Sequence, residues 1–256
     1  MRFSVYLLAL SIALLAGGCG NLVSSGSDGG GPPPGTPDAG PGPGEPDAGP
    51  GPGEPDAAPP VDDTVAQLLA LVQSCDHVVG GQYATDYENA PSINVCGLTG
   101  AVFWKADFDI DCDGKRTAVC NEQTDGAYQP RTSATDSNGE FLDASQLPYV
   151  VIPLPSNRWN YNNSGIDLGT VVAVIYNGKL AYGVFGDQGP DNIIGEASYK
   201  LATLLGIDPD PSSGGTEGPV YYIAFTGGSG MVSKIEDHAE AVQVGQTRTE
   251  ELLQAN

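Results

Sequence analysis

Residues 169–185 read GTVVAVIYNGKLAYGVF, and this stretch carries the strongest fold signal in the chain. Two runs rich in β-branched and aromatic residues flank an Asn-Gly dipeptide at 177–178, a combination that favours the tight turn of a β-hairpin. The stretch therefore predicts two antiparallel strands. Directly after it, residues 186–198 read GDQGPDNIIGEAS, where Asp187 ends the apolar run and Glu196 follows a Gly-Pro turn.

Further segments of strand and helix character surround this hairpin. Short runs rich in β-branched or aromatic residues predict additional strands at 101–104, 149–154 and 219–225. Apolar residues at helical spacing predict helices at 65–75, 196–206 and 233–254. Short strands with glycine-rich turns and one inserted helix are typical of a small closed β-barrel. We therefore predict a mainly β (α+β) domain over residues 64–256, with peripheral helices.

The N-terminus has the pattern of a bacterial export signal. Arg2 precedes an apolar run at 5–15 that is too short to span a bilayer, and small residues then lead to Cys19. This arrangement is similar to a lipobox and implies removal of residues 1–18 and lipidation of Cys19; an ordinary secretory peptide is the alternative. Gly20 after the cysteine favours anchoring in the outer membrane. Three locations stay open: the protein could face the periplasm, face the cell surface or be released from the cell.

Residues 19–63 have the composition of a spacer. The sequence at 37–45 recurs without change at 46–54, and proline, glycine and acidic residues dominate the whole segment. A segment without large apolar side chains cannot form a core. We predict a disordered linker between the lipidated Cys19 and the folded domain.

The remaining cysteines form an even set, which in an exported protein indicates disulfides. They are Cys75, Cys96, Cys112 and Cys120. We favour the pairs Cys75–Cys96 and Cys112–Cys120 because each closes a short loop, although four cysteines allow three pairings. A zinc site has little support, since no CxxC spacing occurs and the chain contains only two histidines.

The chain is strongly acidic, with 32 Asp and Glu residues against 10 Lys and Arg residues and a formal net charge of -22. Such a surface repels nucleic acid and anionic lipid, and it attracts cations. Ser-His-Asp or Cys-His chemistry would need His77 or His238, and neither lies in a glycine-rich elbow. No glycine-rich phosphate loop follows a strand. We therefore expect neither a nucleic-acid partner nor a cofactor.

Three acidic clusters compete as the functional site, and the first covers residues 107–114. Asp107, Asp109 and Asp111 would share one face of a strand and form a dense anionic stripe. The run also opens like a calcium loop, but Cys120 stands where that loop needs its bidentate glutamate, so a complete EF-hand is excluded. A metal, a cationic ligand and plain solvent exposure are all compatible with the stripe.

The neighbours of this stripe favour a cationic ligand. An aromatic and a basic residue directly precede it, and we assign a substrate-binding role to Trp104, Lys105, Asp107, Asp109 and Asp111. We assign no metal ligand. For Trp104, and for Trp159 further along the chain, a position in the core is an equally good interpretation.

The other two clusters lie at 136–143 and at Asp187 with Glu196. The cluster at 136–143 contains a Ser-Asn-Gly turn, so its carboxylates are expected to serve the loop. Asp187 and Glu196 flank a rigid turn at the end of a hairpin strand, where a glycosidase would place its acid and base. The predicted helix at 196–206 would favour an anion at its N-terminus. The structural alternative is that Asp187 binds amides of the turn while Glu196 caps this helix.

Three blocks of the sequence resemble the fungal-type chitosanases of glycoside hydrolase family 75. These blocks are 101–114, 142–153 and 182–198. They occur in the order of that family, and the resemblance runs from about residue 101 to 229. It implies that Asp187 and Glu196 are the essential Asp and Glu of an endo-acting hydrolysis that inverts the anomeric centre.

A fainter similarity concerns the barrel. An Asp-x-Gly-Pro turn followed by an apolar pair and an acid is similar to the double-psi β-barrel pattern of rare-lipoprotein-A-like proteins and family 45 endoglucanases. In those proteins the second acid is the usual proton donor. The similarity therefore implies Glu196 as general acid and Asp187 as general base.

Together these observations predict endo-acting hydrolysis of β-1,4 bonds in chitosan, a polycationic polysaccharide whose ammonium groups suit an acidic cleft. We expect a monomer that contacts the membrane only through its lipid anchor. Two alternatives stay open. One is a non-catalytic glycan-binding lipoprotein in which the acids are structural, and the other is a peptidoglycan-cleaving enzyme on the same barrel.

Overall fold

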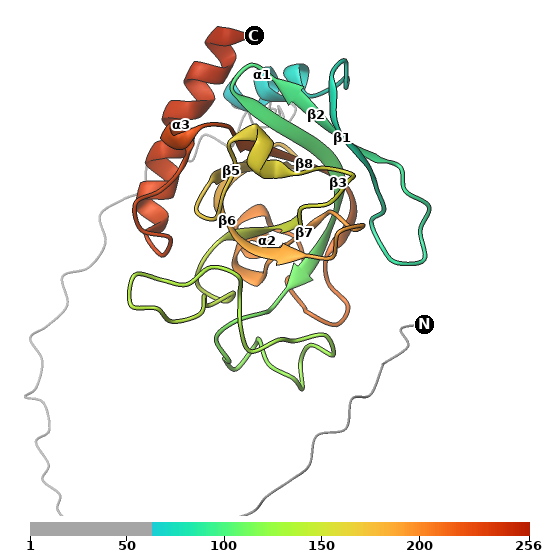
Figure 1. Cartoon of the computed structure of the whole chain (residues 1–256). Coiled ribbons are helices and arrows are strands. Elements are labelled where there is room, and N and C mark those ends of the chain that lie inside the picture. Colours follow the sequence, from blue (N-terminus) through green and yellow to red (C-terminus); the bar gives the residue numbers. More distant parts are fainter. Residues whose placement is uncertain (1–62) are drawn as a thin grey trace, which may run out of the picture. The chain divides into compact units, whose positions relative to one another are not determined.

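Six strands close into a barrel in residues 63–256, the part of the chain that the structure, a computed structural model, describes (Figure 1). In the order of their hydrogen-bonded neighbours they are β3 (Ala101–Asp111), β7 (Glu196–Ser198), β4 (Tyr149–Pro153), β6 (Lys179–Gly189), β5 (Val171–Tyr176) and β8 (Thr216–Phe225), which pairs with β3 again. The predicted mainly β fold with a small closed barrel is confirmed. The predicted signal peptide, the lipidation site Cys19 and the linker up to residue 62 lie outside the described residues.

Two further strands and three α-helices of the described chain lie around the barrel. β1 (Val78–Tyr83) and β2 (Ile93–Leu98) extend the sheet beyond the first residues of β3. The helices are α1 (Asp63–Leu71), α2 (Tyr199–Leu205) and α3 (His238–Ala255), and two short 3-10 helices are η1 (Tyr161–Ser164) and η2 (Gly228–Gly230). The long connection from β3 to β4 gathers at the end of the barrel where β3 stops (Figure 1). Among the described residues, no helix combines the length and the apolar character needed to cross a membrane.

The predicted hairpin is present as β5 and β6. Tyr176 pairs with Lys179 in antiparallel register, and Asn177 and Gly178 form the turn between them. Both turn residues have positive φ, 47° for Asn177 and 75° for Gly178. A two-residue type I′ turn demands this conformation, which Asn and Gly tolerate best. β6 continues past its predicted end, so Asp187 lies inside the strand.

Two parallel strand pairs bring the candidate catalytic residues to one part of the barrel. β3 pairs with β7 so that Asp109 lies opposite Glu196, and β4 pairs with β6 so that Val151 lies opposite Asp187. β4 also pairs with β7. Asp187 and Glu196 therefore lie on the two strands that flank β4. The double-psi subtype of this barrel stays a prediction.

The helix predicted after the Gly-Pro turn begins later than expected, which corrects one argument about Glu196. The chain at Glu196 is extended because β7 pairs with β3, and α2 begins only at Tyr199. Ser198 is the N-cap, because its side chain accepts a hydrogen bond from the Leu201 amide. Gly206 ends the helix with a φ of 74°, as predicted. Glu196 therefore does not cap α2.

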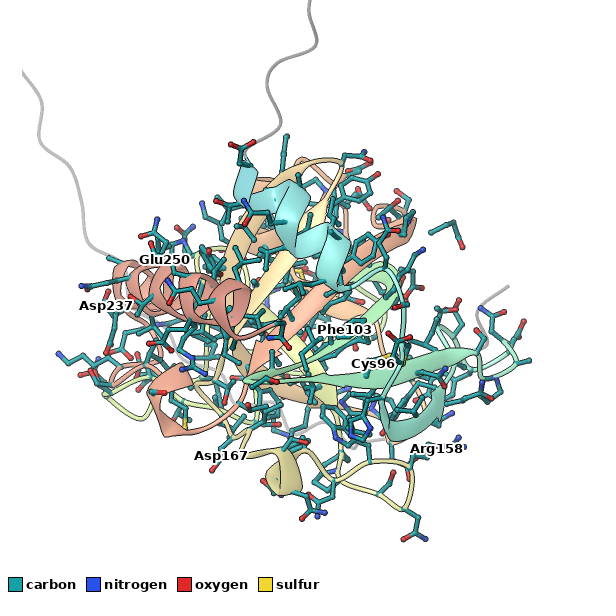
Figure 2. All side chains as sticks on the ribbon, turned by 90° about the horizontal axis from the view of Figure 1, so that it is seen from above. Cys96, Phe103, Arg158, Asp167, Asp237 and Glu250 are labelled. Carbon is teal, nitrogen blue, oxygen red and sulfur yellow. A yellow bond between two sulfur atoms is a disulfide. The ribbon has the colours of Figure 1, made fainter. Side chains whose placement is uncertain are left out.

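Apolar side chains gather in two buried clusters. One cluster includes residues of α2 and Trp104, whose ring stacks on Tyr222 with centroids 5.3 Å apart. The other includes residues of α1 and α3 together with Phe103. Figure 2 labels Phe103 beside Cys96, its partner on β2. Successive residues of β3 thus point into different clusters, as the alternation of a strand requires.

Both predicted disulfides are present. Cys75–Cys96 ties the segment after α1 to β2, and Cys112–Cys120 closes a loop directly after β3. Cys112 lies between Asp111 and Asp113 in the sequence. The second disulfide therefore holds the chain at the place where two acidic side chains leave the strand.

Candidate active site

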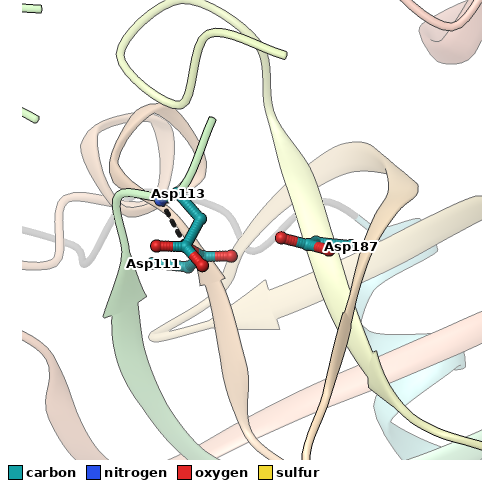
Figure 3. A group of neighbouring side chains, drawn as sticks. All are labelled: Asp111, Asp113 and Asp187. Carbon is teal, nitrogen blue, oxygen red and sulfur yellow. Dashed lines mark hydrogen bonds between the residues drawn. The ribbon is translucent and has the colours of Figure 1, made fainter. Parts of the chain in front are cut away.

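Three carboxylates meet where β3 and β6 end (Figure 3). Asp111 is the last residue of β3, Asp113 follows shortly after it, and Asp187 lies near the end of β6. One carboxylate oxygen from each residue lies within 4.8 Å of those from the other two. Figure 3 shows the Asp187 carboxylate pointing toward Asp111 and Asp113, which leave the same strand end. Two segments far apart in the sequence therefore build one carboxylate cluster.

Asp187 is held by three hydrogen bonds to one oxygen, Oδ1. The amide and the hydroxyl of Ser133 each donate at 2.7 Å, and the amide of Gln188 donates at 2.7 Å. The side chain is 7% exposed, and burial raises the pKa of Asp187, while the donors of Ser133 and Gln188 oppose this rise. Because these donors favour the ionised carboxylate, Asp187 is suited to accept a proton.

Glu196 lies at the start of β7, beside the end of β6. A Cβ atom built on Gly189 of β6 would lie 3.6 Å from Glu196 Oε2, so the two are neighbours. Although the residue is partly exposed, desolvation of its carboxyl raises the pKa of Glu196 to about 8. The carboxylates of Asp109 and, to a smaller extent, Asp187 add to this rise. Glu196 therefore holds its proton to a higher pH than an ordinary glutamate does.

The remaining carboxylates come from β3 and the loop after it. The Asp113 amide donates to Asp111 Oδ1 at 2.6 Å, and the Gln129 amide donates to Asp113 Oδ1 at 2.6 Å. Burial raises the pKa of Asp111 well above its usual value, and the Glu196 carboxyl adds to this effect. Burial also raises the pKa of Asp113 to about 7. Asp125, which is 6% exposed, contributes to the raised pKa of both Asp113 and Glu196.

Sequence reasoning did not assign Asp113, Asp125 or Ser133 to the site. For Asp113 a signal was present, because it is joined to Asp111 through a cysteine predicted to form a disulfide. Asp125 and Ser133 carry no local signal. They reach the site only because the connection between β3 and β4 folds back toward Asp187.

The carboxylate cluster of Asp111, Asp113 and Asp187 fits a hard cation. Carboxylate oxygens are the ligands that Ca²⁺ and Mg²⁺ prefer, and the cluster brings three of them close together. The same oxygens also suit an ammonium group, which forms charge-assisted hydrogen bonds with carboxylates. The expected absence of a metal and of a cofactor stays a prediction.

Two of the residues predicted to bind substrate are accessible. Asp109 is half-buried, and Lys105 is exposed with its Nζ atom 5.4 Å from the centre of the Tyr221 ring. Asp109 lies opposite Glu196, so it borders the candidate acid directly.

Trp104 and Asp107 differ from the prediction. Trp104 is 0% exposed and lies in the core, so its ring offers no free face to a sugar, and Trp159 is 4% exposed. Trp104 lies in the buried first part of β3 and stacks on Tyr222, whereas Asp109 lies in the partly exposed part of the strand. Asp107 is 7% exposed, and its Oδ1 atom is buried without a hydrogen-bond partner.

The acidic cluster at 136–143 serves its loop, as predicted. Oδ1 of Asp136 accepts hydrogen bonds from the amides of Asn138 at 2.8 Å and Glu140 at 2.9 Å. These backbone donors, led by Glu140, lower the pKa of Asp136. This cluster is therefore a turn-stabilising element and a useful reference for the acidic residues of the site.

The sequence matches one protein family and several characterised relatives. Residues 108–252 match the family described as fungal chitosanase of glycosyl hydrolase group 75. Endo-chitosanase B of Aspergillus oryzae is 30% identical over 166 residues, which cover 58% of this chain and 69% of the relative. An endo-chitosanase of Aspergillus oryzae is 34% identical over 143 residues, covering 52% and 58%. An endo-chitosanase of Aspergillus fumigatus is 32% identical over 155 residues, covering 55% and 65%.

Proposed function

The chain belongs to the fungal chitosanase family of glycosyl hydrolase group 75, and we propose that it hydrolyses chitosan with Glu196 as general acid and Asp187 as general base. As a member of this family it is a glycoside hydrolase. Its relatives are named endo-chitosanases, so we infer cleavage of β-1,4 bonds within the chitosan chain. The observation that carries the assignment of roles is a contrast. Burial and neighbouring carboxylates raise the pKa of Glu196 and so favour its protonated form, whereas Asp187 accepts three hydrogen bonds on one oxygen.

In the proposed reaction, Glu196 donates its proton to the glycosidic oxygen while the bond from that oxygen to the anomeric carbon breaks. A water molecule attacks the carbon from the opposite face and passes a proton to Asp187. One product leaves with a new hydroxyl group, and the other carries an anomeric hydroxyl of inverted configuration. Exchange of one proton with solvent at each carboxyl restores the starting state.

We propose inversion on the basis of the resemblance to the fungal-type chitosanases of glycoside hydrolase family 75. Inverting glycosidases separate their two carboxyls by ~6.5–9.5 Å, which leaves room for the attacking water. In the proposed reaction a water molecule, and not a carboxylate, attacks the sugar.

Substrate binding is proposed to depend on the acidic side chains beside the pair. Chitosan carries an ammonium group on each deacetylated sugar, and a net charge of -22 attracts such a polymer. Asp109 and Asp111 are our candidates for contacts with these ammonium groups. Lys105, exposed on the same strand, stays a candidate for a contact with the sugar chain.

The test is the release of reducing ends from chitosan by matched variants. We expect Glu196→Gln and Asp187→Asn each to lower kcat on the order of 10²–10⁴-fold, because each removes one proton transfer. Asp136→Asn is the control, since it changes the same kind of side chain in the loop at 136–143, and its kcat should stay within about twofold. A fully active Glu196→Gln protein would refute the proposal. A wild-type protein that binds chitosan but never cleaves it would also refute it.

Inversion is tested separately by the configuration of the first products. Proton NMR during early hydrolysis of a β-linked oligosaccharide should show the α-anomer before mutarotation. A β-anomer at the earliest times would show retention and would require one of the two carboxylates to attack the sugar directly.

We also propose that residues 64–256 are the catalytic part of an exported, monomeric lipoprotein. The two disulfides support an oxidising compartment outside the cytoplasm. Lipidation of Cys19 and the linker would tether this part to the membrane. Cys19→Ala should move the protein from the membrane fraction to the soluble fraction, whereas an unchanged distribution would contradict the anchor.

A further inference from the structure

Asp107 presents a buried carboxyl whose Oδ1 atom has no hydrogen-bond partner. Buried polar atoms are normally satisfied, so an orphaned one needs an explanation. The residue lies in β3 and its Oδ1 atom is itself buried, which keeps this atom from a sugar in the site. The proposed acid–base chemistry does not use this carboxyl. A different role must account for a polar side chain at this position.

The Oδ1 atom of Asp107 occupies the place that a side chain at position 195 would take. A Cβ atom built on Gly195 would lie 2.0 Å from Asp107 Oδ1 and 3.2 Å from Ala106 Cβ. Two non-bonded heavy atoms cannot lie 2.0 Å apart, so the place is already filled by Asp107 Oδ1. Gly195 also has a φ of 125°, a conformation that residues with a side chain rarely adopt. The Asp107 carboxyl therefore packs directly on the backbone of Gly195.

Gly195 is the residue through which the chain enters β7. Its carbonyl accepts a hydrogen bond from the Asp109 amide at 2.8 Å, and the next residue, Glu196, lies opposite Asp109. Asp107 thus contacts Gly195 through its side chain, while Asp109 holds the Gly195 carbonyl. Two residues of β3 together fix the point at which Glu196 begins.

The Asp107 carboxyl contributes shape and not charge to this contact. Burial raises the pKa of Asp107 to about 8, and the carboxylates of Asp109, Asp86 and Glu217 add to the rise. A neutral carboxyl is far less costly to bury than an ionised one. At neutral pH the group is therefore a small, uncharged body packed on Gly195.

We propose that Asp107 is a positioning residue for Glu196: its side chain packs against Gly195 and fixes the direction in which β7, and with it the Glu196 carboxyl, leaves the turn. The proposal rests on the role of Glu196 as general acid. A misplacement of about 1 Å in a reacting group can lower a rate on the order of 10²-fold. Loss of this contact should therefore lower kcat and leave KM nearly unchanged.

Two substitutions at position 107 separate shape from charge. Asp107→Asn keeps the size and planarity of the side chain, so its kcat at pH 7 should stay within about threefold of wild type. Asp107→Ala removes the contact and should lower kcat by about 10–100-fold, with KM within about twofold. Glu217→Gln is the matched control, because it neutralises an exposed acid that acts on Asp107 only through its charge. It should change neither parameter.

The contact itself is tested by a double-mutant cycle with Gly195→Ala. In the wild type this change forces a Cβ atom onto Asp107 Oδ1 and should lower kcat on the order of 10²-fold. In the Asp107→Ala background that clash is gone, so the same change should lower kcat at least about threefold less. The urea concentration at the midpoint of unfolding is also compared among the same four proteins. The effects of the two changes on this midpoint should again be non-additive. If Gly195→Ala does not fold alone, its recovery in the Asp107→Ala background gives the same information.

Failure of this proposal differs from failure of the proposed function. If the wild type cleaves chitosan and Asp107→Ala keeps its kcat, or if the cycle is additive, Asp107 does not position Glu196. If Asp107→Asn and Asp107→Ala both raise KM with kcat unchanged, the residue contacts substrate instead. If the wild type does not cleave chitosan, the proposed function fails. The cycle in unfolding midpoints then still decides whether Asp107 and Gly195 are coupled.

Discussion

Asp136 in the loop at 136–143 and Asp113 beside β3 are identical side chains whose pKa values are displaced in opposite directions. Both accept hydrogen bonds from backbone amides. For Asp136 the hydrogen bond from the Glu140 amide has the largest effect, and it lowers the pKa. Asp113 is a partly buried member of the carboxylate cluster, and burial raises its pKa to about 7 despite the Gln129 amide.

The two environments depend on different parts of the sequence. The hydrogen bonds of Asp136 come from residues two and four positions later, so a short stretch of sequence is sufficient for them. The desolvation at the site needs β3, β6, β7 and the connection from β3 to β4 to converge. Proton transfer near neutral pH requires the second environment, because a carboxyl must be kept protonated to act as an acid.

The largest effect is expected from removing the disulfide Cys112–Cys120, which lies beside the carboxylate cluster. Cys112→Ser with Cys120→Ser should lower the free energy of unfolding by about 2–4 kcal/mol and also lower kcat, because Asp111 and Asp113 flank Cys112. Cys75→Ser with Cys96→Ser is the matched control. It should lower stability by a similar amount and leave kcat of the folded protein unchanged. Equal kcat values for the two variants would show that the disulfide does not hold the site.

The next effect is the change of stability with pH, and it has opposite signs for Asp136 and for Asp107, a second buried carboxyl whose pKa is raised. For Asp107 the folded pKa, about 8, exceeds the ordinary value of 3.8, so the unfolded chain releases its proton first as pH rises. The stability contributed by this group is complete below about pH 4 and is lost progressively as the pH rises to about 8. Asp107→Asn should remove this decline in urea-unfolding measurements.

Asp136 should behave in the reverse way. Its pKa is lowered in the folded state, so its contribution is present above the unfolded pKa and is lost as pH falls. Asp136→Asn should therefore weaken the protein at pH 7 and remove part of its acid sensitivity. Variants of Asp107 and Asp136 with the same dependence of stability on pH would contradict the comparison.

A smaller effect is expected in the pH dependence of the reaction. A general acid works only while protonated, so kcat should fall about tenfold per pH unit above the pKa of Glu196, which is about 8. Asp109→Asn removes a neighbouring charge that raises this pKa and should move the decline to lower pH. An unchanged profile in Asp109→Asn would show that Asp109 does not act on the acid.

The smallest effect is expected from removal of metal ions. Dialysis of the wild type against a chelator should leave kcat/KM within about twofold, because the proposed proton transfers need only carboxyls and water. Addition of Ca²⁺ or Mg²⁺ should likewise change little. A loss of activity that Ca²⁺ restores would show that the carboxylate cluster binds a metal ion. The ion would then offset the repulsion between its carboxylates.

Local signals in the sequence were sufficient for much of the fold. The Asn-Gly turn at 177–178, the helix end at Gly206 and the loop between Cys112 and Cys120 each depend on neighbouring residues, and the structure has all three. The strand at Glu196 was missed, because an extended conformation there depends on a parallel partner on β3. β1 and β2 were also missed, since their pairing carries no comparable turn signal.

For the site, sequence reasoning found residues but not their surroundings. Asp187 and Glu196 were assigned from one stretch, and the structure places each beside buried carboxylates. The donors of Ser133 and the packing of Asp107 on Gly195 join residues that are far apart in the sequence. Such contacts depend on the closed barrel as a whole, so no local sequence pattern predicts them.

The most direct test of the central claim compares two leaving groups in Glu196→Gln. We predict that kcat/KM for a chitosan oligosaccharide falls on the order of 10²–10⁴-fold, because its leaving sugar must be protonated. For the dinitrophenyl glycoside of the same oligosaccharide, whose leaving group needs no proton, the loss should stay below about tenfold. An equal loss on both substrates, or full activity on the oligosaccharide, would contradict the role of Glu196 as general acid.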